Sequence, residues 1–372
     1  MDRGRSDRGN RQRLKALKEK AENMSFTYPG SMRASVLTAP KQIEMREVDV
    51  PELEPNQVLV RVEAVGVCGS DTHFYETGKI GDIIVRGDVV LGHESAGTIV
   101  AVGRDVPPAR VGARVAVEPQ TVCRRCEYCK RGEYHLCRQV EFYGAWPIDG
   151  SFAEYEVIDD DFAHTIPHHM SFEHAAMAEP VSVAVHAVRK AGVTASSRVL
   201  ITGAGPIGIL IGQVARVFGA SEIVVSDPIA NRREFALGHG ATSVLDPSSA
   251  DFAAFDQHFD IYIDASGNAG AIIASIPTLR PGGRAVLVGM GGDHLEIPVA
   301  MIQHREITLT GTFRYVNTWP TAIELIASGA VSVDALITGR YGLRDVESAL
   351  MMSKTDPAAI KSMVLPALVT GD

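Results

Sequence analysis

The pattern of hydrophobic and polar positions changes once along the chain, near residue 198. Before that point, short apolar runs are separated by Gly, Pro and Asp, a pattern typical of an antiparallel β domain. The predicted strands cover residues 34–38, 43–48, 58–67, 97–102, 114–118 and 153–158. Two helices are predicted to follow, at residues 172–178 and 182–191.

From residue 198 onward, predicted strands and helices alternate. The strands are expected at residues 198–202, 223–226, 243–245, 261–264, 285–289 and 307–310, and the first helix is expected to run to Phe218. Six strands with helices between them predict a doubly wound parallel sheet. The expected fold class is therefore α/β, with a Rossmann sheet accompanied by a mostly β domain.

The two ends of the chain extend this picture. Residues 319–328 and 343–353 read as helices and 363–365 as a last strand. We expect this tail to return to the first domain, so that residues 32–181 and 318–372 form a catalytic domain around an inserted cofactor domain at 182–317. Residues 1–31 read as a disordered basic extension, since the first 23 residues hold eight Lys/Arg and four Asp/Glu and few large apolar residues. A nucleic-acid-binding arm is the alternative interpretation.

Composition limits the partners. The chain has 372 residues, which suggests two domains, and it is 45% hydrophobic and 22% charged, as in globular proteins. Its formal charge of −9 provides no global attraction to nucleic acid or to anionic lipid, so neither partner is expected. No apolar run reaches the roughly 18 residues of a membrane span, and no signal peptide opens the chain, which predicts a cytoplasmic location.

Four of the five cysteines lie in one short segment with the spacing C-x2-C-x2-C-x7-C: Cys123, Cys126, Cys129 and Cys137. Four thiolates on so short a loop can close a tetrahedron around a structural zinc ion. The neighbouring cations are expected to lower the pKa of these thiols: Arg124, Arg125, Lys130 and Arg131. An iron–sulfur cluster is the alternative, although the last gap is longer than in the compact ferredoxin motif.

The fifth cysteine, Cys68, lies in the run V-C-G-S-D-T-H at 67–73 and has no partner in that segment. His93 and Glu94 in G-H-E, and Glu179 in A-E-P, are the best candidate partners. A set of Cys, His and a carboxylate suits zinc with one position left open for catalysis. Each residue alone has an ordinary explanation, such as a buried thiol or a helix start, so their joint presence beside a dinucleotide fold carries the prediction.

The run G-A-G-P-I-G at 203–208 lies between a predicted strand and a predicted helix, which is the context of a dinucleotide site. Gly203 allows the tight turn, Gly205 lets the backbone approach a pyrophosphate, and Gly208 lets helix and strand pack closely. Asp227, 19 residues past Gly208, can accept hydrogen bonds from ribose hydroxyls and repel a 2′-phosphate, so NAD is predicted over NADP. Arg232 could pair with such a phosphate, but we expect it to flank the adenine. A plain glycine turn with a surface Asp is the alternative.

These motifs, together with F-R-Y-V-N-T-W-P at 313–320, resemble the zinc-containing medium-chain dehydrogenases, and within them the polyol dehydrogenases of the sorbitol and xylitol type. The resemblance covers about residues 32–366 and implies a GroES-like catalytic domain. Alcohol dehydrogenases of this superfamily usually have Cys where Glu179 stands, and Glu is typical of polyol and diol members. The resemblance also implies a homodimer or homotetramer.

The resemblance implies roles for individual residues. Catalytic zinc would be bound by Cys68, His93 and Glu94, with Glu179 as a ligand or as a partner through water. Contacts to NAD would come from Ile207, Asp227, Arg232, Val288, Gly289, Met290, Phe313, Arg314 and Tyr315. The substrate would meet Arg314, Tyr315, Glu179, Phe74 and Tyr143. Many sorbitol-type members have Tyr where this chain has Phe74, so its substrate preference can differ.

The expected chemistry is oxidation of a secondary hydroxyl of a polyol to a ketose. Zinc lowers the pKa of a bound hydroxyl group and NAD accepts the hydride. Ser70 and His73 are spaced to relay the proton to solvent, with Glu179 as the third catalytic residue, although an ordinary surface histidine is the simpler interpretation of His73. The alternatives are a butanediol- or threonine-type dehydrogenase, and a non-catalytic protein that binds NAD(H).

Overall fold

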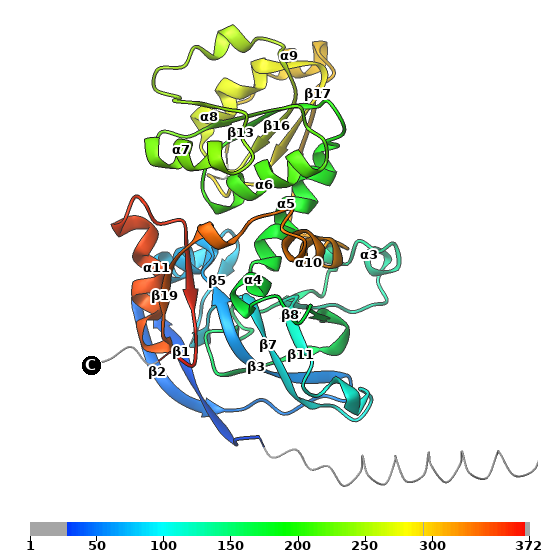
Figure 1. Cartoon of the computed structure of the whole chain (residues 1–372), viewed down its shortest axis with the longest axis vertical. Coiled ribbons are helices and arrows are strands. Elements are labelled where there is room, and N and C mark those ends of the chain that lie inside the picture. The colour runs from blue at the N-terminus through cyan, green and yellow to red at the C-terminus, as the bar shows by residue number, and fades with distance from the viewer. Residues whose placement is uncertain (1–27, 293, 369–372) are drawn as a thin grey trace, which may run out of the picture.

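The computed structural model describes residues 28–292 and 294–368. A β domain and a parallel sheet with flanking helices lie at opposite ends of the molecule, and helices α5 (Ala178–Ala191) and α10 (Trp319–Ala327) lie between them (Figure 1). The extension predicted at residues 1–31 falls, as far as residue 27, outside the described residues.

The β domain is built on a seven-stranded sheet with the order β12-β8-β7-β3-β20-β19, in which β11 also pairs with β3. A three-stranded sheet, β2-β1-β6, packs beside it. The strands of the two sheets that precede the parallel sheet in the chain are β1 (Ser31–Ala39), β2 (Gln42–Asp49), β3 (Gln57–Gly66), β6 (Val89–Val90), β7 (Glu94–Val102), β8 (Arg114–Val117), β11 (Tyr155–Asp159) and β12 (Ala163–Thr165). Most of these strands have residues buried in a hydrophobic core, and β2 packs its partly buried Ile43, Met45 and Val48 against one. The apolar runs of the sequence therefore located the longer strands, whereas the short strands β6 and β12 were not predicted.

The C-terminal segment lies against this domain, as the red elements beside the blue strands show in Figure 1. It contains η6 (Asp334–Leu336), β19 (Ile337–Tyr341), η7 (Leu343–Asp345), α11 (Val346–Thr355) and β20 (Lys361–Val364). Strand β20 runs antiparallel to the end of β3, with Met363 opposite Gly66 and Val364 opposite Val65. The last strand of the chain therefore lies next to the segment that contains Cys68.

The second sheet is parallel throughout and has the order β15-β14-β13-β16-β17-β18. Its strands are β13 (Arg198–Thr202), β14 (Glu222–Ser226), β15 (Ser243–Leu245), β16 (Phe259–Asp264), β17 (Leu279–Leu287) and β18 (Thr308–Gly311). The intervening helices are α6 (Pro206–Val217), α7 (Ala230–Gly238), α8 (Ala269–Ser275) and α9 (Val299–His304). The predicted α/β fold class is confirmed, and β17 begins six residues before the predicted start at 285.

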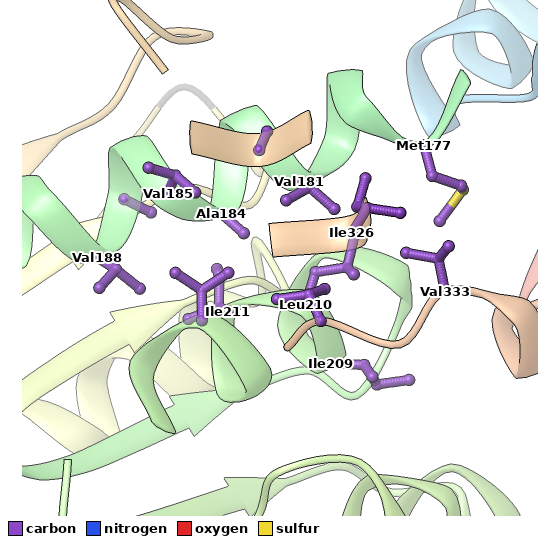
Figure 2. Close-up of a cluster of buried hydrophobic side chains, with 14 of the residues drawn as sticks. Met177, Val181, Ala184, Val185, Val188, Ile209, Leu210, Ile211, Ile326 and Val333 are labelled. Atoms are coloured by element: carbon purple, nitrogen blue, oxygen red, sulfur yellow. The ribbon is translucent and has the colours of Figure 1, made fainter. Parts of the chain in front are cut away.

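Helix α5 (Ala178–Ala191) begins four residues earlier than predicted. Pro180 is compatible with this earlier start, because in the first turn of a helix its missing N–H costs no hydrogen bond. Figure 2 shows the apolar cluster that α5 shares with α6, with α10 (Trp319–Ala327) and with the segment after it: Met177, Val181, Ala184, Val185, Val188, Ile209, Leu210, Ile211, Ile326 and Val333. Glu179 is therefore carried by the first turn of a helix that is packed on several sides.

Smaller elements complete the described structure. The cysteine segment, here called the cysteine lobe (residues 120–142), contains β9 (Gln120–Thr121), α3 (Glu127–Lys130), η2 (Tyr134–Leu136) and β10 (Glu141–Phe142). The others are α2 (Gly69–Thr77), β4 (Lys79–Ile80), β5 (Ile83–Ile84), η1 (Pro108–Arg110), η3 (Asp160–Phe162), α4 (Phe172–Ala176), η4 (Phe252–Phe255) and η5 (Ile276–Thr278). Within residues 28–292 and 294–368, no helix combines the length and the apolar character that crossing a membrane requires.

Candidate active site

Three candidate metal ligands meet at the end of β3. Strands β3 and β7 pair antiparallel with Gly66 opposite Glu94, which places Cys68, just beyond β3, beside His93, just before β7. One donor atom from each of Cys68, His93 and Glu94 lies within 4.8 Å of the other two. His93 and Glu94 are 5% and 1% exposed, so the group is enclosed by protein. We call these three residues the catalytic donor group.

Asp71 orients this group, and the sequence analysis missed it. Cys68 is the N-cap of α2, and its N–H donates to Asp71 Oδ2 at 2.9 Å. The other oxygen, Oδ1, lies 3.2 Å from His93 Nδ1 and accepts the N–H of Gly92. Burial disfavours the charged imidazole, but the Asp71 carboxylate outweighs it and raises the pKa of His93 well above its usual value. A carboxylate three residues after an N-cap is a capping signature that could have identified Asp71.

The contact to Asp71 leaves the other ring nitrogen of His93 facing the donor group. His93 Nε2 lies 3.4 Å from Ser70 Oγ. A carboxylate on one nitrogen of a histidine that binds metal through the other is the usual arrangement around zinc. The donors also match the sulfur, nitrogen and oxygen set of catalytic zinc sites, so these residues fit a zinc ion.

Lys361 is the second residue that the sequence analysis missed. It lies on β20, is 4% exposed, and its ammonium forms an ion pair with Glu94 Oε2. Burial alone would lower the pKa of Lys361, but the charges of Glu94 and Cys68 raise it above its ordinary value. No motif marks this lysine, which stands alone before an apolar run, so only the pairing of β20 with β3 brings it to the site.

Glu179 lies near the catalytic donor group but is not one of its three members. It is 5% exposed, and its burial, with the charge of Glu94, raises the pKa of its carboxyl group to about 7. Tyr315 is fully buried beside it, and burial together with the Glu179 charge raises the pKa of Tyr315 well above its usual value. A second, separate carboxyl group is thus available at this site.

The predicted relay residues occupy different environments. Ser70 is half-buried against His93, whereas His73 is exposed. Both lie on α2, three residues apart, so their side chains are neighbours on one face of the helix. The order Ser70 to His73 therefore runs from the donor group toward solvent.

The predicted substrate residues are only partly brought together. Arg314 stacks over the ring of Phe142 at 3.6 Å, and that ring lies 5.2 Å from His93. Tyr143 faces the other way: its hydroxyl lies 3.4 Å from Thr121 Oγ1, and its ring packs with the cluster beneath the cysteine lobe. Phe142 therefore borders the site, whereas the Tyr143 ring packs beneath the cysteine lobe. Phe74 is 4% exposed in the core of the β domain.

The glycines at the start of α6 have the geometry that a dinucleotide needs. Gly203 adopts φ 92°, and a Cβ at Gly208 would overlap the Gly203 carbonyl oxygen. A Cβ at Gly205 would meet nothing within 4 Å, which leaves open space above the helix N-terminus where a pyrophosphate binds. The residues present therefore fit a dinucleotide cofactor.

The acidic residue after β14 is well fixed. Asp227 is 5% exposed, and its two oxygens accept the N–H groups of Ala204 and Ile229 at 2.8 Å each. Arg233 donates to the Asp227 carbonyl oxygen and pairs with Asp246, whereas Arg232 has no side-chain partner among the described residues. Arg232 is therefore the arginine available to a cofactor.

The remaining predicted cofactor residues follow the ends of β17 and β18, at the carboxyl edge of the sheet where such ligands bind. Val288 and Gly289 donate their N–H groups to the Asp264 carbonyl oxygen, and a Cβ at Gly289 would overlap the backbone of Gly267. Met290 and Phe313 are about half exposed, at 52% and 49%. Ile207 lies in the first turn of α6.

The cysteine lobe forms a second donor group. One sulfur atom from each of the four cysteines lies within 4.8 Å of the other three. The backbone N–H groups of Arg125 and Cys126 lower the pKa of Cys123 to about 6. Two of the four cationic side chains that were predicted to do this are paired elsewhere, since Arg124 contacts Asp159 and Asp161, and Arg131 contacts Glu133. Four clustered thiols with N–H donors fit a closed zinc site.

Comparisons with known proteins agree with this geometry. Residues 54–168 match the model of the alcohol dehydrogenase GroES-like domain, and residues 206–328 match the zinc-binding dehydrogenase model. Sorbitol dehydrogenase of Bacillus subtilis is 38% identical over 352 residues, covering 92% of this chain and 99% of that protein. A probable D-xylulose reductase A of Neosartorya fischeri is 39% identical over 356 residues, covering 92% and 97%.

A solved structure with a similar fold is L-idonate 5-dehydrogenase of Escherichia coli, with a TM-score of 0.84 and 30% identity over 90% of this chain and 98% of that one. The relatives are matched over nearly their whole length, and the matched GroES-like region contains both donor groups. This chain belongs to the zinc-dependent medium-chain dehydrogenases of the polyol type.

Proposed function

We propose that the protein oxidises a secondary hydroxyl group of a polyol to a ketone, with NAD as the hydride acceptor. The observation that carries the proposal is the enclosed catalytic donor group, Cys68, His93 and Glu94, with the separate buried carboxyl of Glu179 beside it. The names of the relatives, a sorbitol dehydrogenase and a D-xylulose reductase, support a polyol as the substrate class.

Each residue of the site has a part in this reaction. Cys68, His93 and Glu94 would hold zinc, which lowers the pKa of a bound hydroxyl group. NAD would lie along the Gly203 to Gly208 turn and accept the hydride at the carboxyl edge of the parallel sheet. Asp71 keeps His93 in one orientation.

The polar residues around the donor group would handle the proton and the substrate. Ser70 would take the hydroxyl proton and pass it to His73, which is exposed and can exchange it with water. Glu179, Arg314 and Tyr315 would orient the other hydroxyl groups, since a polyol presents several hydrogen-bonding groups near the reacting carbon. Phe142 would form an apolar wall between His93 and Arg314.

The proposal includes a preference for NAD over NADP and a division into two parts. The fixed carboxylate of Asp227 supports the preference, because it would repel a 2′-phosphate. Residues 32–181 with 318–372 would form the catalytic part and 182–317 the cofactor part, and the pairing of β20 with β3 supports this division.

We also propose a homodimer or homotetramer in the cytoplasm. Strand β18 is the last strand of the parallel sheet, and among the described residues no further strand pairs with its outer edge. The exposed apolar side chains Met290, Val299 and Phe313 lie in neighbouring segments. Five cysteines without a disulfide support a reducing compartment. Light scattering of the purified protein tests the oligomeric state.

Initial rates of NADH formation test the activity. The panel is sorbitol, xylitol, ribitol, galactitol and 2,3-butanediol, each with NAD and with NADP, before and after removal of zinc by a chelator. We expect the fastest rates with a polyol and NAD, and loss of the rate without zinc. A higher rate with butanediol would favour the diol alternative. NADH binding without turnover of any alcohol would favour the non-catalytic alternative.

A further inference from the structure

The ammonium group of Lys361 lies beside the proposed zinc site, where it would be a positive charge in addition to the metal ion. The lysine and glutamate side chains of the pair between Lys361 and Glu94 are 3% and 1% exposed, so water screens neither charge. Burying a lysine is costly unless its charge is paired, and removing one partner of such a pair leaves an uncompensated buried charge. The ion pair with Lys361 therefore favours the orientation in which the Glu94 carboxylate points toward β20.

The space for this orientation comes from Gly66 at the end of β3. A Cβ at this position would overlap Glu94 Oε2 and would lie 3.1 Å from Lys361 Cε and 3.2 Å from Glu94 Cβ. Gly66 is opposite Met363, two residues from Lys361, in the β3–β20 pairing. A missing side chain on one strand and a cation on its neighbour thus favour the same position of the carboxylate.

The same carboxylate is within reach of the other two donors. One oxygen of Glu94 lies within 4.8 Å of the ligand atoms of Cys68 and His93. Glu94 can therefore be attracted by a metal ion on one side and by Lys361 on the other. The balance between the two determines how firmly Glu94 binds the metal.

We propose that Lys361 is a positioning residue that restrains Glu94, so that this carboxylate holds the metal weakly and a ligand position stays accessible to the substrate hydroxyl. The inference rests on the proposed function, since it requires a metal in the catalytic donor group. Gly66 assists by leaving room for the restrained carboxylate. Without the lysine charge, the metal is the remaining cation for Glu94, which then binds it firmly.

Cobalt in place of zinc gives a readout that does not depend on activity, because its visible absorption bands report the ligand set. In the cobalt-loaded full-length protein, we expect Lys361→Met to shift these bands and to slow cobalt release to a chelator by about tenfold, the scale of effects from residues around metal ligands. Lys361→Arg keeps the charge and should retain the wild-type bands. Gly66→Ala removes the space and should shift the bands in the direction of Lys361→Met.

Glu94→Gln is the matched variant at the other end of the pair. If Lys361 restrains Glu94 in the wild type, Glu94→Gln should change the rate of cobalt release by less than about twofold, and it should abolish the band shift when combined with Lys361→Met. Acceleration of release by tenfold or more in Glu94→Gln would show that Glu94 already holds the metal firmly, and would overturn the inference.

The outcomes separate this inference from the proposed function. If the wild type binds metal only at the cysteine lobe, the proposed function fails before any variant is made. If it binds two metal ions and Lys361→Met lowers the unfolding temperature with no change in bands or release, Lys361 is only a structural partner and the inference alone is overturned. Should Lys361→Met fail to fold, wild-type bands in Gly66→Ala would overturn it.

Discussion

The catalytic donor group and the cysteine lobe draw their donors from the chain in different ways. The lobe takes four thiols from residues 123–137 and leaves three of them partly exposed. The catalytic donor group takes a thiol, an imidazole and a carboxylate from the ends of two strands, and encloses two of the three. Its orientation depends on Asp71 from α2 and Lys361 from β20.

The difference reflects two tasks. In the lobe, identical ligands and backbone N–H groups would close around a zinc ion, which would stabilise this short segment. In the catalytic donor group, the ligands are mixed and have charged neighbours, which suits a zinc ion with one position left for the substrate. Loss of the first ion should therefore affect folding, and loss of the second should affect chemistry.

The largest expected effect comes from Cys68→Ala. Loss of this ligand should remove one of two zinc ions per chain, and the activity should fall by at least about 10³-fold, because the metal contributes several kcal/mol to the reaction. Metal analysis and NADH initial rates measure the two changes. Full activity in a Cys68→Ala protein would contradict the proposed function.

The matched change in the lobe is Cys129→Ala, which should remove the other zinc ion. We expect a lower unfolding temperature, by about 2–4 °C for each kcal/mol lost in a domain of 150–250 residues. The protein that remains folded should keep the first zinc ion. Calorimetry with metal analysis tests this, and an unchanged unfolding temperature would remove the contrast between the two groups.

A smaller effect is expected for Asp71→Asn, which keeps the shape of the side chain but removes the charge facing His93. Metal affinity or activity should fall by about 10–100-fold, as for other carboxylates behind zinc-bound histidines. The control is Asp149→Asn, whose carboxylate accepts the N–H of Val90 at 2.8 Å in the same domain. Equal losses in both variants would show that Asp71 only stabilises the fold.

The smallest effect should come from His73→Gln. The residue is exposed, so water can take over part of its role as a proton acceptor. The rate should therefore fall by about tenfold or less, which is smaller than the roughly 10²–10⁴-fold contribution of a typical general base. His168→Gln, at another exposed histidine, is the control. An equal rate in His73→Gln and in the wild type would exclude His73 from the relay.

Local patterns predicted much of this molecule. The alternation of strands and helices after residue 198 predicted the parallel sheet, because each strand and helix buries one apolar face. The spacing of the cysteines predicted the cluster of four thiols, because all four lie in one short segment. Local patterns were less reliable at the start of α5, which lies at Ala178 rather than at the predicted residue 182. They also did not identify Phe142, which contacts the ring of His93.

By itself, the sequence determined the fold class, the glycine turn, the cysteine lobe and the candidate donors Cys68, His93 and Glu94. These features depend on residue type and on short spacing along the chain, and both can be read directly from the sequence. The tertiary structure alone decided that Asp71 faces His93 and that Lys361 faces Glu94. The first contact depends on the pairing of β3 with β7 and the second on the pairing of β20 with β3. A capping pattern could mark Asp71 in the sequence, but it does not specify either pairing.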